Sequence, residues 1–105
     1  MPTNEELYSE AERLKDSGDL EGAAKKLDEL LAQDPQFALA HSALAVICGR
    51  LRRHEEAIQH ALKVCELEPK DAFSFTALSV TYQRAGRIPE AEEAMARARM
   101  MQMQH

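Results

Sequence analysis

The sequence repeats with a period of 34 residues, and this periodicity constrains the fold more than any other feature. Residues 4–37, 38–71 and 72–105 align without a gap. Small or apolar residues recur in the same columns: Ala11, Ala45 and Ser79; Ala23, Ala57 and Ala91; Leu14, Cys48 and Tyr82; Leu27, Ala61 and Met95. One copy is too short to bury its apolar residues alone, so we expect three stacked copies that share a continuous core.

Each copy divides into two amphipathic helices. Leu7, Ala11 and Leu14 follow one another at i, i+4 and i+7, which is the spacing of one helix face. Gly18 and Gly86 indicate the turn inside a copy, and Pro35 and Pro69 indicate the turn between copies, because proline cannot continue a helix. The predicted helices cover residues 4–17, 20–33, 37–51, 54–67, 71–85 and 88–102. Thr3, followed by Glu6, predicts a capping box at the first of these.

Composition favours one all-α domain over residues 1–105. The net charge is −5, and no segment is basic enough to predict nucleic-acid binding. Neither a signal peptide nor an apolar run of about 20 residues is present, so no membrane partner is predicted and a cytoplasmic location is the default. Cys48 and Cys65 lie within apolar helical patterns and are predicted to be buried, free thiols.

The three copies resemble the tetratricopeptide repeat (TPR). The third copy carries nearly the whole family pattern: Phe75, Leu78, Ser79, Tyr82, Gly86, Ala91, Met95 and Ala98. The first has Glu10 where the family has leucine, and the second departs most, with His41, Cys48 and Arg52 in family positions. The resemblance implies a right-handed α–α superhelix of three helix pairs. It also implies a protein interaction scaffold or adaptor that binds a peptide or helix of another protein on its concave face.

The family's concave columns give a predicted partner-binding groove. In this sequence they hold Tyr8, Glu12, Leu39, Ser42, Val46, Gly49, Arg50, Phe73, Thr76, Val80 and Arg84. The positions that match the family's clamp for acidic chaperone tails are Tyr8, Glu12, Ala43, Phe73 and Ala77, which carry neither the required cations nor the amides. We therefore predict no chaperone-tail binding by that clamp. An apolar floor edged by Arg50 and Arg84 fits a hydrophobic helix or short peptide, unless these apolar residues pack against neighbouring repeats. Gly49 either opens a pocket or marks an early helix end.

The last helix raises an alternative function. Repeat arrays usually finish with a polar capping helix, and none follows residue 102 in this sequence. The predicted self-association face comprises Ile88, Ala91, Met95, Ala98 and Met101. Either this face is tolerated as exposed surface, or another molecule covers it. The alternative to an adaptor is thus a structural self-assembly module that forms homo-oligomers, by a symmetric or a head-to-tail contact.

Motifs for chemistry are not found. The sequence has no phosphate-binding glycine loop and no nucleophile elbow. His54 and His60 are six positions apart, which places them on opposite sides of a helix. The two histidines of a zinc-binding helix are four positions apart, so this pair does not suit a zinc site. The acids Glu5, Glu6, Glu10 and Glu12 fit a solvated helix face. We predict no enzyme activity, no metal and no cofactor.

Overall fold

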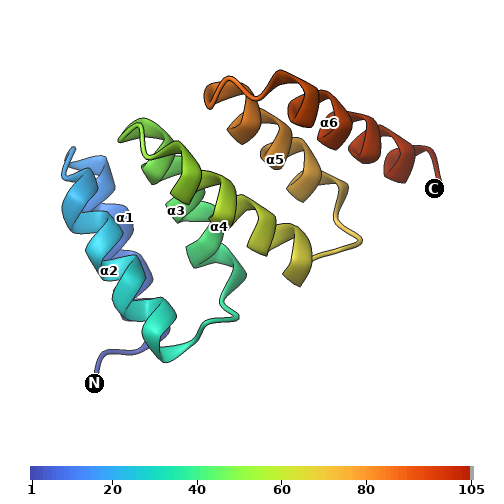
Figure 1. Cartoon of the computed structure of the whole chain (residues 1–105). Helices are drawn as coiled ribbons and strands as arrows, with labels where there is room; N and C mark the ends of the chain where they lie inside the picture. The colour runs from blue at the N-terminus through green and yellow to red at the C-terminus, as the bar shows by residue number, and fades with distance from the viewer. Residues whose placement is uncertain (105) are drawn as a thin grey trace.

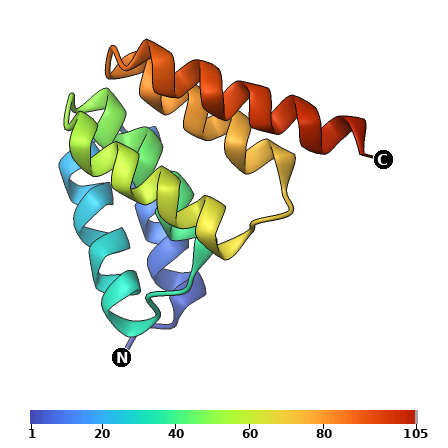
Figure 2. The same cartoon turned by 45° about the vertical axis from the view of Figure 1, so that its right-hand side comes forward.

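Three antiparallel helix pairs stack side by side in a computed structural model that describes residues 1–104 (Figure 1). The final residue of the predicted third repeat, His105, lies outside the described residues. The helices are α1 (Asn4–Asp16), α2 (Leu20–Gln33), α3 (Ala38–Arg50), α4 (His54–Leu67), α5 (Ala72–Arg84) and α6 (Ile88–Met103). The molecule is a right-handed α–α superhelix of three repeats, with its first and last helices at opposite ends of the stack (Figure 2). The predicted helix bounds are confirmed to within one residue.

Local sequence signals determine where these helices begin. The Thr3 hydroxyl accepts from the Glu6 amide at 3.1 Å, while the Thr3 amide donates to the Glu6 carboxylate at 2.9 Å. These two bonds form the predicted capping box and satisfy amides that the helix cannot pair internally. The hydrogen bond from the Thr3 backbone amide, and then the Thr3 side chain, lower the pKa of the Glu6 carboxyl. At α2 the Asp19 side chain accepts from the Gly22 amide at 2.9 Å.

The turn inside each repeat requires a left-handed backbone residue. Gly18 has φ of 93° and Gly86 has φ of 78°, and glycine adopts this conformation without strain. In the second repeat the same position holds Arg52, with φ of 63°. The second repeat therefore makes the same turn with a residue whose side chain disfavours it.

Small residues let the helices approach closely. Ala11, Ala23 and Ala57 are buried, and the Ser79 hydroxyl donates to the Ala91 carbonyl at 2.7 Å across the α5–α6 contact. The column of small residues found in the sequence is thus the contact between helices, as the packing distance of about 8–10 Å requires.

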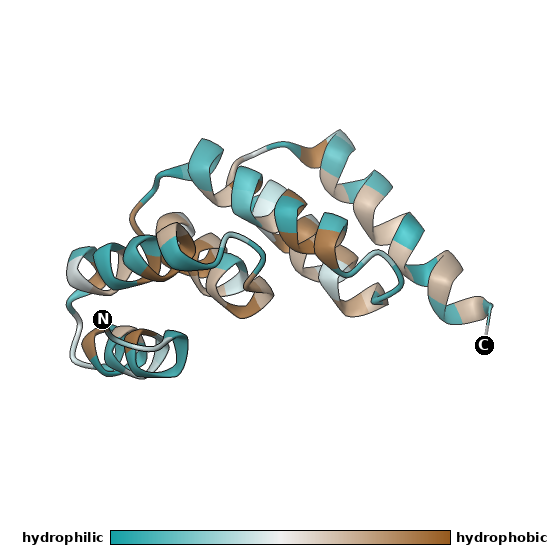
Figure 3. Cartoon of the chain, turned by 90° about the horizontal axis from the view of Figure 1, so that it is seen from below, coloured by the Kyte–Doolittle hydropathy of each residue, from teal (hydrophilic) through white to brown (hydrophobic). Residues whose placement is uncertain are grey.

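The core has two parts of unequal size. The first joins repeat one to α3 and α4 and contains Leu7, Leu27, Leu30, Leu44 and Ile47. The second joins α3–α4 to α5–α6 and contains Leu78, Cys65 and three alanines. In Figure 3, α6 after its first turn is teal where it is charged or polar and pale tan elsewhere, because its apolar residues there are alanine and methionine in place of larger branched side chains. The buried residues of α5 and α6 are Leu78, two serines and three alanines, which are mostly smaller than the leucines and Ile47 of the first part of the core.

Candidate functional site

A groove of about 660 Å³ lies between the second and third repeats. Its walls are α3 and α5, and its floor comes partly from Ala61 and Val64 of α4. Helix α5 packs mainly on α6 and α4 and only slightly on α3. The faces of α3 and α5 that point at each other are therefore left uncovered.

The walls of this groove carry large exposed apolar side chains. Leu39 and Val46 of α3 are 58% and 47% exposed, and Phe73 and Val80 of α5 are 77% and 37% exposed. All four line the groove, whereas nine large apolar side chains are exposed in residues 1–104 as a whole. Exposed apolar residues gathered in one concave surface are typical of a binding site for another molecule.

The structure brings seven of the eleven predicted groove residues together at this site. They are Leu39, Ser42, Val46, Phe73, Thr76, Val80 and Arg84. Tyr8 does not line it, because its ring packs on Phe37 with centroids 6.2 Å apart. Glu12 pairs instead with Lys15 on α1 at 3.3 Å. Gly49 and Arg50 are the last two residues of α3 and do not line the groove, but they follow the lining residue Val46 by three and four positions.

Several lining residues were missed by reasoning from the sequence. Ala61 and Val64 belong to α4, a helix that the family pattern does not place on the concave face. Glu68 and Asp71 line the groove from the turn between α4 and α5. These four residues line the groove because α5 stands apart from α3. The repeat pattern in the sequence carries no signal for the distance between those two helices.

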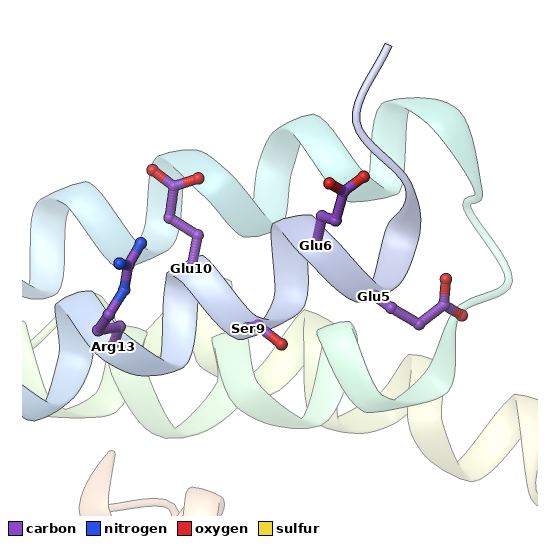
Figure 4. Close-up of a pocket in the computed structure, with 5 residues that line it drawn as sticks. All are labelled: Glu5, Glu6, Ser9, Glu10 and Arg13. Carbon is purple, nitrogen blue, oxygen red and sulfur yellow. The ribbon is translucent and has the colours of Figure 1, made fainter.

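A second hollow lies on α1 alone. It is lined by Glu5, Glu6, Ser9, Glu10 and Arg13 (Figure 4). Figure 4 shows Glu6, Glu10 and Arg13 along one side of the helix, with Glu5 and Ser9 pointing elsewhere. Glu10 also pairs with Lys26 of α2 at 3.7 Å. One helix without an opposing wall presents a solvated charged face, as predicted.

Two histidines meet between α3 and α4, which the sequence analysis did not predict. The Nδ1 atoms of His41 and His60 are 3.0 Å apart, and Nε2 of His41 lies 2.9 Å from the Pro35 carbonyl oxygen. A carbonyl only accepts, so His41 donates from Nε2 and accepts at Nδ1 from the Nδ1–H of His60. Burial, and then the neighbouring His41, lower the pKa of His60, against the opposing effects of Asp28 and Glu56.

The two cysteines, the remaining candidates for chemistry, are core residues. Cys48 and Cys65 are buried free thiols, as predicted, and burial raises the pKa of each to about 11. Such thiols are poor nucleophiles at neutral pH. In residues 1–104 no cluster of three metal-ligating side chains occurs. The described helices include none long and apolar enough to cross a membrane.

The predicted self-association face needs correction. Ala91 and Ala98 are each only 1% exposed, because they form part of the contact with α5. Met95 and Met101 are half-buried. The large exposed apolar side chains of α6 are Ile88, which belongs to the predicted face, and Met100 and Met103, which do not. The alanines share a helix face that is needed within the third repeat itself.

Solved structures with the same architecture include several repeat proteins. A crystal structure of MamA shares 18% identity, covers 97% of this chain and superposes with a TM-score of 0.88. A structure of YrrB, described as a TPR protein with an unusual peptide-binding site, shares 20% identity over 100% of this chain, with a TM-score of 0.86. This chain spans 60% of the MamA chain and 54% of the YrrB chain.

The second TPR of Spaghetti (RPAP3), bound to the HSP90 peptide SRMEEVD, is closer in length. It shares 16% identity, and the match covers 94% of this chain and 92% of that one, with a TM-score of 0.83. At these identities the likeness concerns the fold alone. No curated protein matches the sequence. The family model for the tetratricopeptide repeat matches residues 8–72. The chain therefore belongs to the tetratricopeptide repeat family.

Proposed function

We propose that this chain is a single interaction domain that binds a peptide or helix of a partner protein in the groove between α3 and α5. The observation that carries this proposal is the set of exposed apolar side chains on both walls, Leu39 and Val46 facing Phe73 and Val80. Removing such side chains from water on binding contributes a favourable free energy of about 25 cal/mol per Å² of buried apolar area, which the entropy lost on association partly offsets.

The known neighbours support binding of this kind. One is described as having a peptide-binding site, and another is bound to a peptide. A chaperone tail such as the HSP90 peptide does not fit the residues of this chain. The five positions that match the chaperone-tail clamp hold Tyr8, Glu12, Ala43, Phe73 and Ala77, and Glu12 would repel a carboxylate. The adaptor role proposed here involves no catalysis and no cofactor.

A displayed library of random peptides tests the proposal directly. A peptide of about 12 residues, if helical, matches the length of a 13-residue wall helix, which is about 20 Å. Peptides selected on the wild-type chain should carry apolar residues and should lose binding to the Val46→Glu/Val80→Glu variant. Both valines are exposed, so this variant keeps the fold, which circular dichroism checks. The matched control is Leu62→Glu, an exposed change on α4 outside the groove.

Self-association is the second candidate, and the exposed Ile88, Met100 and Met103 of α6 favour it. Methionine adapts readily to apolar contact surfaces. Sedimentation at high micromolar concentration should then show oligomers that Met100→Lys/Met103→Lys dissociates. A wild-type monomer under those conditions would remove this candidate and leave the groove proposal intact.

A further inference from the structure

Opposite charges lie at the two ends of the groove. Helices α3 and α5 are both antiparallel to α4, so their carboxyl ends lie at the same end (Figure 1). Arg50 is the last residue of α3 and Arg84 the last of α5. At the opposite end the groove is lined by Glu68, which caps α4, and Asp71, which caps α5. The groove therefore has apolar walls, a positively charged end and a negatively charged end.

The two arginines continue the apolar walls. Val46 precedes Arg50 by four residues, and Val80 precedes Arg84 by four, so each pair shares one helix face. Arg84 also reaches toward α3, because its Nη1 lies 4.0 Å from where a Cβ on Gly49 would stand. A segment that lies on the two valines would reach the two arginines if it continued by about one helical turn along α3 and α5.

These arginines are free to bind an anion. Within residues 1–104 neither Arg50 nor Arg84 forms an ion pair. The arginines three residues further along the chain behave differently, since Arg53 pairs with Glu21 and Arg87 with Glu55 and Glu90. The carbonyls at a helix carboxyl end stabilise nearby cations, so the two free arginines are tolerated without acids.

The acidic end of the groove offers fewer free charged groups to a partner than the basic end does. The two oxygens of Asp71 already accept from the Phe73 amide at 3.0 Å and from the Ser74 hydroxyl at 3.1 Å. Glu68 is exposed, and its carboxylate accepts no hydrogen bond and forms no ion pair within residues 1–104. One acid is thus available there, against two arginines at the other end.

We propose that the partner in this groove is an apolar peptide segment with carboxylates at one end, which bind Arg50 and Arg84. Guanidinium groups bind carboxylates through paired hydrogen bonds, and an apolar surround strengthens them. The free Glu68 favours a basic residue, and disfavours an acidic one, at the other end of the segment. This inference rests on the proposed function, because the apolar walls must first hold the peptide.

Selection from the same peptide library on two versions of the full chain tests the inference. The first is the wild type, and the second is Arg50→Glu/Arg84→Glu. In both selections, peptides that also bind Val46→Glu/Val80→Glu are discarded, so that only groove binders remain. Wild-type binders should be enriched in Asp and Glu at one end of their apolar pattern, and the charge-reversed variant should select Lys and Arg at that end.

Affinities of the selected peptides complete the test. An acidic-ended wild-type binder should bind Arg50→Gln/Arg84→Gln about fivefold to tenfold more weakly. The matched control Arg53→Gln removes a paired arginine and should leave its affinity unchanged. Groove binders without an acidic end, or an unchanged affinity for the glutamine variant, would overturn the inference while leaving the proposed function intact. No groove binders at all would overturn both.

Discussion

Arg52 occupies a position where the other two repeats have glycine. Its φ of 63° lies in the left-handed region, which costs a residue with a Cβ about 1–2 kcal/mol. We expect Arg52→Gly to raise the free energy of unfolding by about 0.5–1 kcal/mol, because part of the relieved strain is offset by the greater freedom of glycine in the unfolded chain. Urea unfolding followed by circular dichroism measures this change. Arg52→Ala, which removes the charge and keeps the strain, should show no gain.

Two other glycines provide an opposed pair of substitutions. A Cβ on Gly49 would meet no atom closer than Arg84 Nη1 at 4.0 Å, so Gly49→Ala should stabilise α3 by about 0.5–1 kcal/mol. A Cβ on Gly22 would lie 2.3 Å from Asp19 Oδ2, and Asp19 would have to leave its capping position. Gly22→Ala should therefore give no gain or a loss. Equal urea midpoints for the two variants would contradict this expectation.

Residue-level features were the least predictable from the sequence. The repeat alignment singled out His41 and Arg52 as departures from the family pattern, but it did not show what each departure does. The contact between His41 and His60 joins residues 19 positions apart on two helices, and its hydrogen bonds depend on exact side-chain placement. Tyr8 shares a column with groove residues and yet packs on Phe37. A column specifies a helix face and leaves the neighbour of that face undetermined.

At the scale of helices, prediction succeeded because several signals agree. Apolar spacing, the Thr3 capping box, turn glycines and Pro35 all point to the same bounds, so the six helices were predicted to within one residue. The face of α6 was predicted less well. Alanines spaced i, i+3 and i+7, as Ala91, Ala94 and Ala98 are, fit an exposed face or a close helix contact equally, and only the packing on α5 decides between them.

The helices of the third repeat should open before those of the first two. Of the seven largest fully buried side chains, only Ser79 lies beyond residue 48 among the described residues. In a repeat array each unit is held by its own core and by its nearest neighbour, so a smaller core lowers the local opening free energy. Native-state hydrogen exchange should show less protection in α5 and α6 than in α2 and α3, by about 1–2 kcal/mol. Uniform protection across all six helices would contradict this expectation.

For the whole molecule, the histidine contact between α3 and α4 should make stability depend on pH. Burial and His41 lower the pKa of His60 in the folded chain, so folded His60 binds its proton more weakly than unfolded His60 does. The resulting stabilisation is present above the ordinary histidine pKa of about 6.5 and is lost as pH falls toward the lowered value. The urea midpoint of the wild type should therefore decrease as the pH is lowered from about 7 to about 5.

The variant His60→Gln tests this expectation. It keeps a donor for His41 and cannot titrate, so its urea midpoint should decrease less over this pH range. The control Leu51→Ala trims a half-buried side chain of the same core and leaves both histidines in place, so it should retain the wild-type pH dependence. If His60→Gln and the wild type lose equal stability on acidification, His60 is not the group responsible.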